Sequence, residues 1–193
     1  RRSGKSKLLE EFKNYILINM QDSNIIEIDF NSLDYENLRE YHALNRYIEE
    51  RYIKGKNNFV LIDEVQMCDG FEKTINSLHA SEKYDIYITG SNAFLMSSDL
   101  ATLFTGRTYE LEIFPFSFKE YLQYNDDMNV DEAFNKYVRE GGMSGSYLYK
   151  EEEQKYKYIL DVYNTLIVRD IREKYKIKNI ELLDNLTNFM MDN

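Results

Sequence analysis

The segment from Phe59 to Glu64 constrains the fold more than any other stretch of the sequence. Four apolar residues stand in a row, and two acids, Asp63 and Glu64, follow them directly. A short apolar run without alternation is typical of a strand that is buried on both faces, as in a parallel sheet. Ligands bind at the carboxyl ends of the strands in open α/β sheets. The segment therefore predicts an α/β fold with two acids at its ligand-binding edge.

Helical and strand patterns alternate around this segment, as an α/β fold requires. Helical spacing of apolar residues predicts helices at Ser6–Met20, Tyr35–Ile53, Gly70–Ser81 and Ala93–Phe104, with a short one at Phe116–Leu122. Short runs rich in β-branched and aromatic residues predict further strands at Ile25–Phe30, Asp85–Asn92 and Tyr109–Phe114.

The first six residues match the second half of the P-loop pattern G-x-x-x-x-G-K-[ST]. Backbone N–H groups at the start of the following helix would point at phosphate. Lys5 would reach the β- and γ-phosphates, and the Ser6 hydroxyl would bind Mg²⁺. The predicted phosphate-binding residues are Arg2, Ser3, Gly4, Lys5, Ser6 and Lys7. The alternative is a basic tail that leads into a helix.

The acids at the end of the Phe59–Glu64 strand match a Walker B element. Asp63 would hold Mg²⁺ together with Ser6, and Glu64 would polarise the attacking water. The alternative is a strand followed by two solvated acids in a turn. The Gly-Lys-Ser sequence upstream favours the Walker B interpretation.

Three further polar residues are candidates for the same site. Asn92 or Ser91, at the end of the Asp85–Asn92 strand, could sense the γ-phosphate, and we favour Asn92 because Ser91 could equally cap the next helix. Arg107 precedes the last predicted core strand, where oligomeric ATPases carry an arginine finger. It could instead be a surface arginine that pairs with nearby acids. Gln66 could contact nucleotide or a partner subunit, or lie on a loop surface.

The character of the chain changes after residue 125. Helices are predicted at Val130–Glu140, Glu151–Tyr175 and from Asn179 onward, and Gly141–Gly145 is interpreted as a hinge. We therefore expect a P-loop ATPase core at 1–125 and a helical lid or linker at 126–193.

The composition limits the classes of function. The net charge of −10 over 193 residues argues against a nucleic-acid-binding module, which needs Lys and Arg to neutralise phosphate. No apolar run approaches the roughly 20 residues that span a bilayer. The single cysteine, Cys68, excludes an internal disulfide. We expect a cytoplasmic protein without membrane insertion.

Taken together, these motifs resemble those of the AAA-type P-loop ATPases, and most closely a prokaryotic group whose core precedes an uncharacterised C-terminal domain. The resemblance covers nearly the whole chain and rests on RRSGKSKLL (Arg1–Leu9), FVLIDEVQ (Phe59–Gln66), DIYITGSNAFLMSS (Asp85–Ser98), LATLFTGR (Leu100–Arg107), IFPFSFKEYL (Ile113–Leu122) and GGMSG (Gly141–Gly145).

The resemblance implies an ASCE-type parallel sheet of order 5-1-4-3-2 with helices on both faces. It also implies binding and hydrolysis of Mg-ATP, and self-assembly into a homo-oligomer in which Arg107 acts in trans. The chain departs from the family pattern at both ends. The first P-loop Gly and its strand are expected upstream of Arg1, and a C-terminal domain is expected beyond Asn193.

The leading hypothesis is an ATPase that uses ATP and Mg²⁺ and acts on an unknown protein or nucleic-acid client. The alternative is a nucleotide-gated binding module in which hydrolysis is incidental. A small-molecule kinase is a weaker option, because the acid pair at Asp63 and Glu64 suits activation of water better than an acceptor site.

Overall fold

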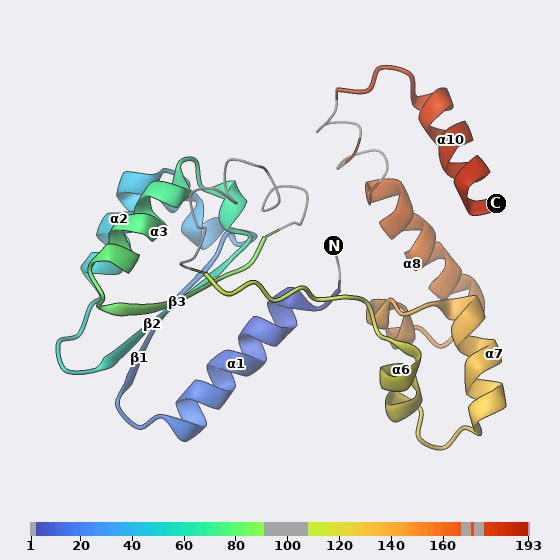
Figure 1. Cartoon of the computed structure of the whole chain (residues 1–193), viewed down its shortest axis with the longest axis horizontal. Helices are drawn as coiled ribbons and strands as arrows, with labels where there is room; N and C mark the ends of the chain where they lie inside the picture. Colours follow the sequence, from blue (N-terminus) through green and yellow to red (C-terminus); the bar gives the residue numbers. More distant parts are fainter. Residues whose placement is uncertain (1–2, 91–107, 167–170, 172–175, 193) are drawn as a thin grey trace. The chain divides into compact units, whose positions relative to one another are not determined.

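The computed structural model describes residues 3–90, 108–166, 171 and 176–192. The chain divides into two compact units. The first unit comprises Lys5–Leu111, and the second comprises Arg1–Gly4 together with Glu112–Asn193. Figure 1 labels the helices and strands of both units.

Three parallel strands form the centre of the first unit: β1 (Ser23–Asp29), β2 (Asn57–Asp63) and β3 (Tyr84–Ile88). Their order across the sheet is β1-β2-β3, and β2 is buried from Asn58 to Asp63. The predicted α/β fold with a buried parallel strand is therefore confirmed. The observed order corresponds to the 4-3-2 part of the expected sheet, and the full order 5-1-4-3-2 stays a prediction.

Helices cover both faces of this sheet (Figure 1). On one face lies α1 (Lys5–Asn19), where Ile16 is fully buried and the ring centroids of Phe12 and Tyr87 are 4.5 Å apart. On the other face lie α2 (Tyr41–Glu49) and α3 (Phe71–Ala80). Because strand side chains alternate between faces, the even-numbered positions of β1 and β2 meet these two helices. The resulting apolar core includes Ile26, Ile28, Val60, Ile62, Leu44, Ile48, Ile75 and Leu78.

The single helix predicted from Tyr35 to Ile53 is wrong. The chain instead forms a short 3-10 helix, η1 (Leu33–Leu38), and then α2. Between them Glu40 is extended, with φ −123° and ψ 135°, and forms a parallel β-bridge with Asp69. The Glu40 carboxylate accepts hydrogen bonds from two backbone N–H groups in the first turn of α2. A tertiary contact and a helix cap therefore interrupt a segment whose apolar spacing stays helical.

The strand predicted at Tyr109–Phe114 is also wrong. These residues belong to no strand, and Tyr109, Leu111 and Phe114 are 87%, 68% and 67% exposed. A strand needs a neighbour that completes its backbone hydrogen bonds, and none of the described strands pairs with this segment. Alternation of apolar and acidic residues therefore does not suffice to make it a strand here.

The second unit is helical in its described part. The helix predicted at Val130–Glu140 is confirmed, as is the helix near the end of the chain. The short helix begins at Phe118 because Ser117 and Glu120 form a capping box. The bounds are Phe118–Tyr124 (α6), Val130–Glu140 (α7), Ser144–Leu148 (η3, a 3-10 helix), Glu152–Asn164 (α8) and Ile180–Asp192 (α10).

Two predicted helices extend beyond the described residues or lie outside them. The helix predicted at Glu151–Tyr175 is confirmed for α8, while residues 167–170 and 172–175 lie outside the described residues. The helix predicted at Ala93–Phe104 lies wholly outside them.

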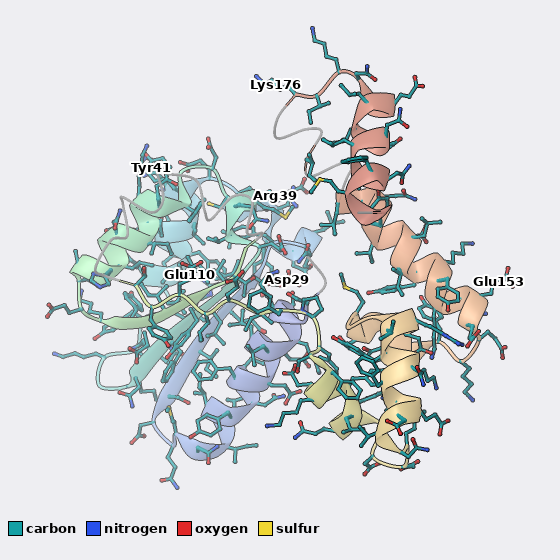
Figure 2. All side chains as sticks on the ribbon, turned by 45° about the vertical axis from the view of Figure 1, so that its right-hand side comes forward. Asp29, Arg39, Tyr41, Glu110, Glu153 and Lys176 are labelled. Atoms are coloured by element: carbon teal, nitrogen blue, oxygen red, sulfur yellow. The ribbon has the colours of Figure 1, made fainter. Side chains whose placement is uncertain are left out.

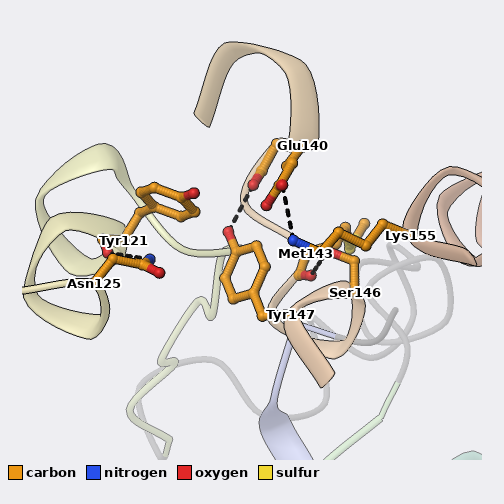
Figure 3. A network of polar contacts seen from close by, with 8 residues as sticks. Tyr121, Asn125, Glu140, Met143, Ser146, Tyr147 and Lys155 are labelled. Atoms are coloured by element: carbon orange, nitrogen blue, oxygen red, sulfur yellow. Dashed lines mark hydrogen bonds and ion pairs between the residues drawn. The ribbon is translucent and has the colours of Figure 1, made fainter. Parts of the chain in front are cut away.

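A buried ion pair and a cluster of tyrosines form the centre of the second unit (Figure 3). Glu140, at the end of α7, is 4% exposed, and its Oε1 accepts a hydrogen bond of 2.8 Å from Lys155 Nζ of α8. The Tyr121 ring lies 5.3 Å from the rings of Tyr137 and Tyr147. Burial and the nearby Glu140 carboxylate raise the pKa of Tyr121 to about 12. The Lys155 ammonium of the same unit balances the charge of Glu140.

Close packing explains two glycines of the segment Gly141–Gly145. The Gly142 carbonyl accepts a hydrogen bond of 2.7 Å from the Phe116 N–H, and a Cβ on Gly142 would lie 2.1 Å from the Phe116 carbonyl oxygen. A Cβ on Gly145 would lie 2.1 Å from the Tyr158 hydroxyl. These glycines allow close approach of neighbouring groups, and the hinge stays a prediction.

Candidate functional site

Acidic and hydroxyl side chains gather at the carboxyl end of the sheet. Asp29 ends β1, Asp63 ends β2, and Thr89 directly follows β3. Asp29 and Asp63 are partners in the register of their strands, and Figure 2 shows Asp29 near this edge. Sequence reasoning identifies Asp63 but misses Asp29 and Thr89. A signal exists for both, because each stands near the carboxyl end of a predicted strand.

Asp63 is a buried carboxylate with 6% of its surface exposed. The Thr89 hydroxyl donates a hydrogen bond to Asp63 Oδ1. Among the described residues, no Lys, Arg or His forms an ion pair with this carboxylate. A buried charge is costly unless it is paired or bound to a metal. The Asp63 carboxylate is therefore suited to bind a cation that is not among the described residues, such as a metal ion.

Glu64 lies in a tight turn directly after β2. Its backbone has φ 53° and ψ 49°, the left-handed region that non-glycine residues rarely adopt. The Glu64 N–H donates to Thr89 Oγ1 at 3.2 Å, and the Val65 N–H donates to the Thr89 carbonyl at 2.9 Å. The turn that carries Glu64 is thus anchored to the end of β3.

Gln66 contacts the side chain of Glu64. It lies in the 3-10 helix η2 (Val65–Met67), and its Nε2 donates a hydrogen bond to Glu64 Oε2. The Gln66 Oε1 is buried and accepts no hydrogen bond from the described residues. The structure thus gives Gln66 a local contact in addition to the roles that the sequence leaves open. Its side chain holds one carboxylate oxygen of Glu64.

The helix that follows the P-loop half motif begins where the motif requires. Gly4 has φ 97°, a conformation that favours glycine, and α1 begins at Lys5. Lys5 is half-buried and Ser6 is exposed. Figure 1 shows that α1 begins at the end of the sheet where the strands end. The start of α1 and the acids of β2 therefore lie at one edge of the same unit.

Of the other predicted residues, Ser3 and Lys7 belong to the part of the chain that the structure describes. The Lys7 ammonium lies 3.0 Å from Glu10 and 3.3 Å from Glu11 on its own helix, and hydrogen bonds to these two acids raise the pKa of Lys7. Ser3 precedes the helix and is half-buried. The remaining predicted residues, Arg2, Ser91, Asn92 and Arg107, lie outside the described residues.

The oxygen ligands at this edge fit Mg²⁺. Carboxylate and hydroxyl oxygens are hard ligands, and Mg²⁺ is commonly held by one or two protein carboxylates plus substrate phosphates. Asp63 and Ser6 supply such oxygens. Across the described ranges, no group of three or more His, Cys, Asp or Glu residues could hold a metal ion. Asp63 and Ser6 are therefore the described residues that could hold Mg²⁺ at this edge.

Cys68 is not a candidate nucleophile. Its side chain is 1% exposed and belongs to the apolar core of the first unit. Burial raises the pKa of the thiol to about 12, so Cys68 stays protonated near neutral pH.

Comparison with known protein families identifies the family to which the chain belongs. A family described as AAA domain matches residues 1–122, which include α1, the whole sheet and the acid pair. The chain belongs to this AAA domain family. The resemblance seen in the sequence is thereby confirmed, and with it the assignment to AAA-like nucleotide-binding domains.

Two curated relatives match the AAA domain chain over its full length. A protein of Haemophilus influenzae is 34% identical over 199 residues, and MJ1544 of Methanocaldococcus jannaschii is 30% identical over 210 residues. Both are described as uncharacterised. The chain covers 50% and 45% of these relatives, so it spans about half of their length.

Within the described ranges, the AAA domain chain has no helix that is both long and apolar enough to cross a bilayer.

Proposed function

We propose that the protein binds Mg-ATP and hydrolyses it by in-line attack of water on the γ-phosphate. The observation that supports this most directly is the pair Asp63 and Glu64, which follows a buried parallel strand. The helix that begins at Lys5 starts at the same edge of the sheet. Membership of the AAA domain family adds independent support.

Each residue at this edge has a proposed role. Lys5 and the backbone around Gly4 hold the phosphates, as positive charge and N–H groups at a helix start favour anions. Ser6 and Asp63 hold Mg²⁺, which when bound neutralises charge on the phosphates. The Glu64 carboxylate accepts a proton from the attacking water, a role that requires it to reach that water.

Two roles concern residues outside the described part of the chain. Asn92 senses the γ-phosphate, and Arg107 reaches the nucleotide of a neighbouring subunit, which makes the working form a homo-oligomer. We also propose a cytoplasmic location. We propose that its client is a protein or a nucleic acid.

The test is to measure the native mass of the full-length gene product with and without ATP and Mg²⁺. Retained nucleotide and a larger assembly are expected in the wild-type protein. Lys5→Ala should weaken ATP binding about 10- to 100-fold, because it removes the positive charge nearest the phosphates. Lys13→Ala, on the same helix but facing Glu27, is the matched control and should bind ATP normally.

The outcomes separate the alternatives. ATP binding that is indifferent to Lys5→Ala would contradict the proposed site. Binding with negligible turnover, but with a large ATP-dependent change in partner affinity, would support the nucleotide-gated module. A phosphorylated product other than free phosphate would support a kinase. Turnover that rises steeply with protein concentration, and that is lost in Arg107→Ala, would support the oligomeric ATPase.

A further inference from the structure

Thr89 connects the two acids of the candidate site. Its hydroxyl donates to Asp63 Oδ1 and accepts from the Glu64 N–H at 3.2 Å. Its backbone N–H donates to the Ile62 carbonyl at 2.8 Å, and its carbonyl accepts from the Val65 N–H at 2.9 Å. One residue at the end of β3 therefore contacts four consecutive residues at the end of β2.

The contact with Asp63 fixes a side chain that has no other described polar partner. The Thr89 hydroxyl is the one hydrogen-bond donor to the Asp63 carboxylate among the described residues. Because Asp63 is 6% exposed, water competes little for this oxygen. Hydrogen bonds to a ligating carboxylate set its orientation, and their loss typically costs 10- to 100-fold in metal affinity or activity.

The contact with Glu64 stabilises an unusual backbone. A left-handed turn at a glutamate costs free energy and persists only where the surroundings hold it. The Thr89 hydroxyl satisfies the Glu64 N–H within that turn. Without the hydroxyl, this N–H would lack its acceptor and the direction of the Glu64 side chain would be less well defined.

We propose that Thr89 is a positioning residue whose single hydroxyl orients Asp63 toward the cation and Glu64 toward the attacking water. The inference rests on the proposed hydrolysis of Mg-ATP, and it assigns the end of β3 a role in both metal binding and turnover. The backbone of Thr89 continues the hydrogen bonding between β3 and β2, and its hydroxyl contacts both acids.

The experiment compares three substitutions in the full-length gene product. Thr89→Val and Thr89→Ala remove the hydroxyl, and Thr89→Ser keeps it. Binding of Mn²⁺ in the presence of ADP is measured by electron paramagnetic resonance, because this readout does not depend on turnover. The kcat and KM for ATP are measured at saturating Mg²⁺, and the Tm of each variant is recorded.

Both hydroxyl-free variants should weaken Mn²⁺ binding about 10-fold and lower kcat about 10-fold, with KM changed less than about twofold. Thr89→Ser should stay within about threefold of wild type in both readouts. A purely structural role would lower the Tm but leave the Mn²⁺ affinity of the folded protein unchanged.

Three results would overturn the proposal. The first is wild-type Mn²⁺ binding and kcat in both hydroxyl-free variants of an active protein, which would leave the proposed ATPase intact. The second is failure of both to fold while Thr89→Ser folds, which would make the hydroxyl structural. The third is a wild-type protein that binds neither ADP nor Mn²⁺, which would overturn the proposed function as well.

Discussion

Two carboxylates are buried among the described residues, one in each unit, and their surroundings differ. Asp63 ends a strand of the parallel sheet, and Thr89 supplies its hydrogen bond without a positive charge. Glu140 ends a helix, and Lys155 supplies a cation at 2.8 Å. The second unit balances its buried charge internally, whereas in the first unit no described cation pairs with Asp63.

Under the proposed function, this difference would separate a structural charge from a functional one. A buried ion pair contributes little net stability, but removing one partner leaves the other charge buried and uncompensated. A buried acid without a cationic partner is the kind of group found where a protein binds cations or performs chemistry. We therefore expect the two buried acids to respond differently to substitution.

The largest effect is expected at the acid next to Asp63. Glu64→Gln removes the proposed proton acceptor and should lower ATP turnover about 10²- to 10³-fold while ATP is still bound. Steady-state phosphate release and equilibrium binding of ATP would measure the two quantities. Glu36→Gln, an exposed acid of η1, is the matched control. Near-normal turnover in Glu64→Gln would contradict the proposed role of Glu64 as the proton acceptor.

The next effect contrasts the two buried acids directly. Glu140→Gln leaves the Lys155 charge buried and unpaired, so it should lower the free energy of unfolding by about 3 kcal/mol. Asp63→Asn removes a charge that has no described cation, so it should change stability by less than about 1 kcal/mol. Urea denaturation followed by circular dichroism would measure both.

The double substitution Glu140→Gln with Lys155→Met removes both charges and should recover part of the loss. Equal destabilisation by Asp63→Asn and Glu140→Gln would break the comparison, because it would mean that Asp63 also has a structural partner.

A smaller effect concerns pH and the tyrosines near Glu140. The pKa of Tyr121 is raised to about 12 in the folded protein, against about 10 for an exposed tyrosine. Above pH 10 the unfolded chain releases this proton first, so stability falls as pH rises toward 12. The loss should reach about 2 kcal/mol.

The comparison of variants isolates this contribution. Tyr121→Phe should flatten the pH dependence of the free energy of unfolding between pH 10 and 12. Tyr109→Phe, at a position that is 87% exposed, should leave it unchanged. An identical slope in wild type and Tyr121→Phe would show that the buried cluster does not control the alkaline transition.

The smallest effect is expected for an ion pair at the surface of the first unit. Lys13 on α1 lies 2.7 Å from Glu27 on β1, with side chains 28% and 45% exposed. Lys13→Met should cost less than about 1 kcal/mol, and the cost should shrink in high salt. Glu27→Gln should match it. A loss as large as that of Glu140→Gln would show that burial does not govern the strength of these pairs.

The sequence predicts those parts of the fold that local pattern determines. The buried strand β2, the helix from Lys5 and the helix at Val130–Glu140 follow from apolar spacing and capping residues. The break at Glu40 could not be predicted, because it depends on a bridge to Asp69, far along the chain. The exposed segment at Tyr109–Phe114 shows that alternation without a pairing neighbour is insufficient.

The candidate site follows the same division. Asp63 and Glu64 are recognisable because they are adjacent to an apolar strand and downstream of Gly-Lys-Ser. The bridging role of Thr89 depends on the register between β2 and β3, in which Ile62 pairs with Ile88. No pattern within either strand alone encodes that register, so the contact becomes visible only in three dimensions.

The rate at which Cys68 is chemically modified can measure local opening near the segment that carries Asp63 and Glu64. Cys68 is the single cysteine of the sequence, it lies five residues after Asp63, and its thiol is sealed in the core with a pKa of about 12. A thiol reagent can modify Cys68 only when this part of the core opens. The labelling rate therefore reports how often the core around this one residue, close to the end of β2, opens.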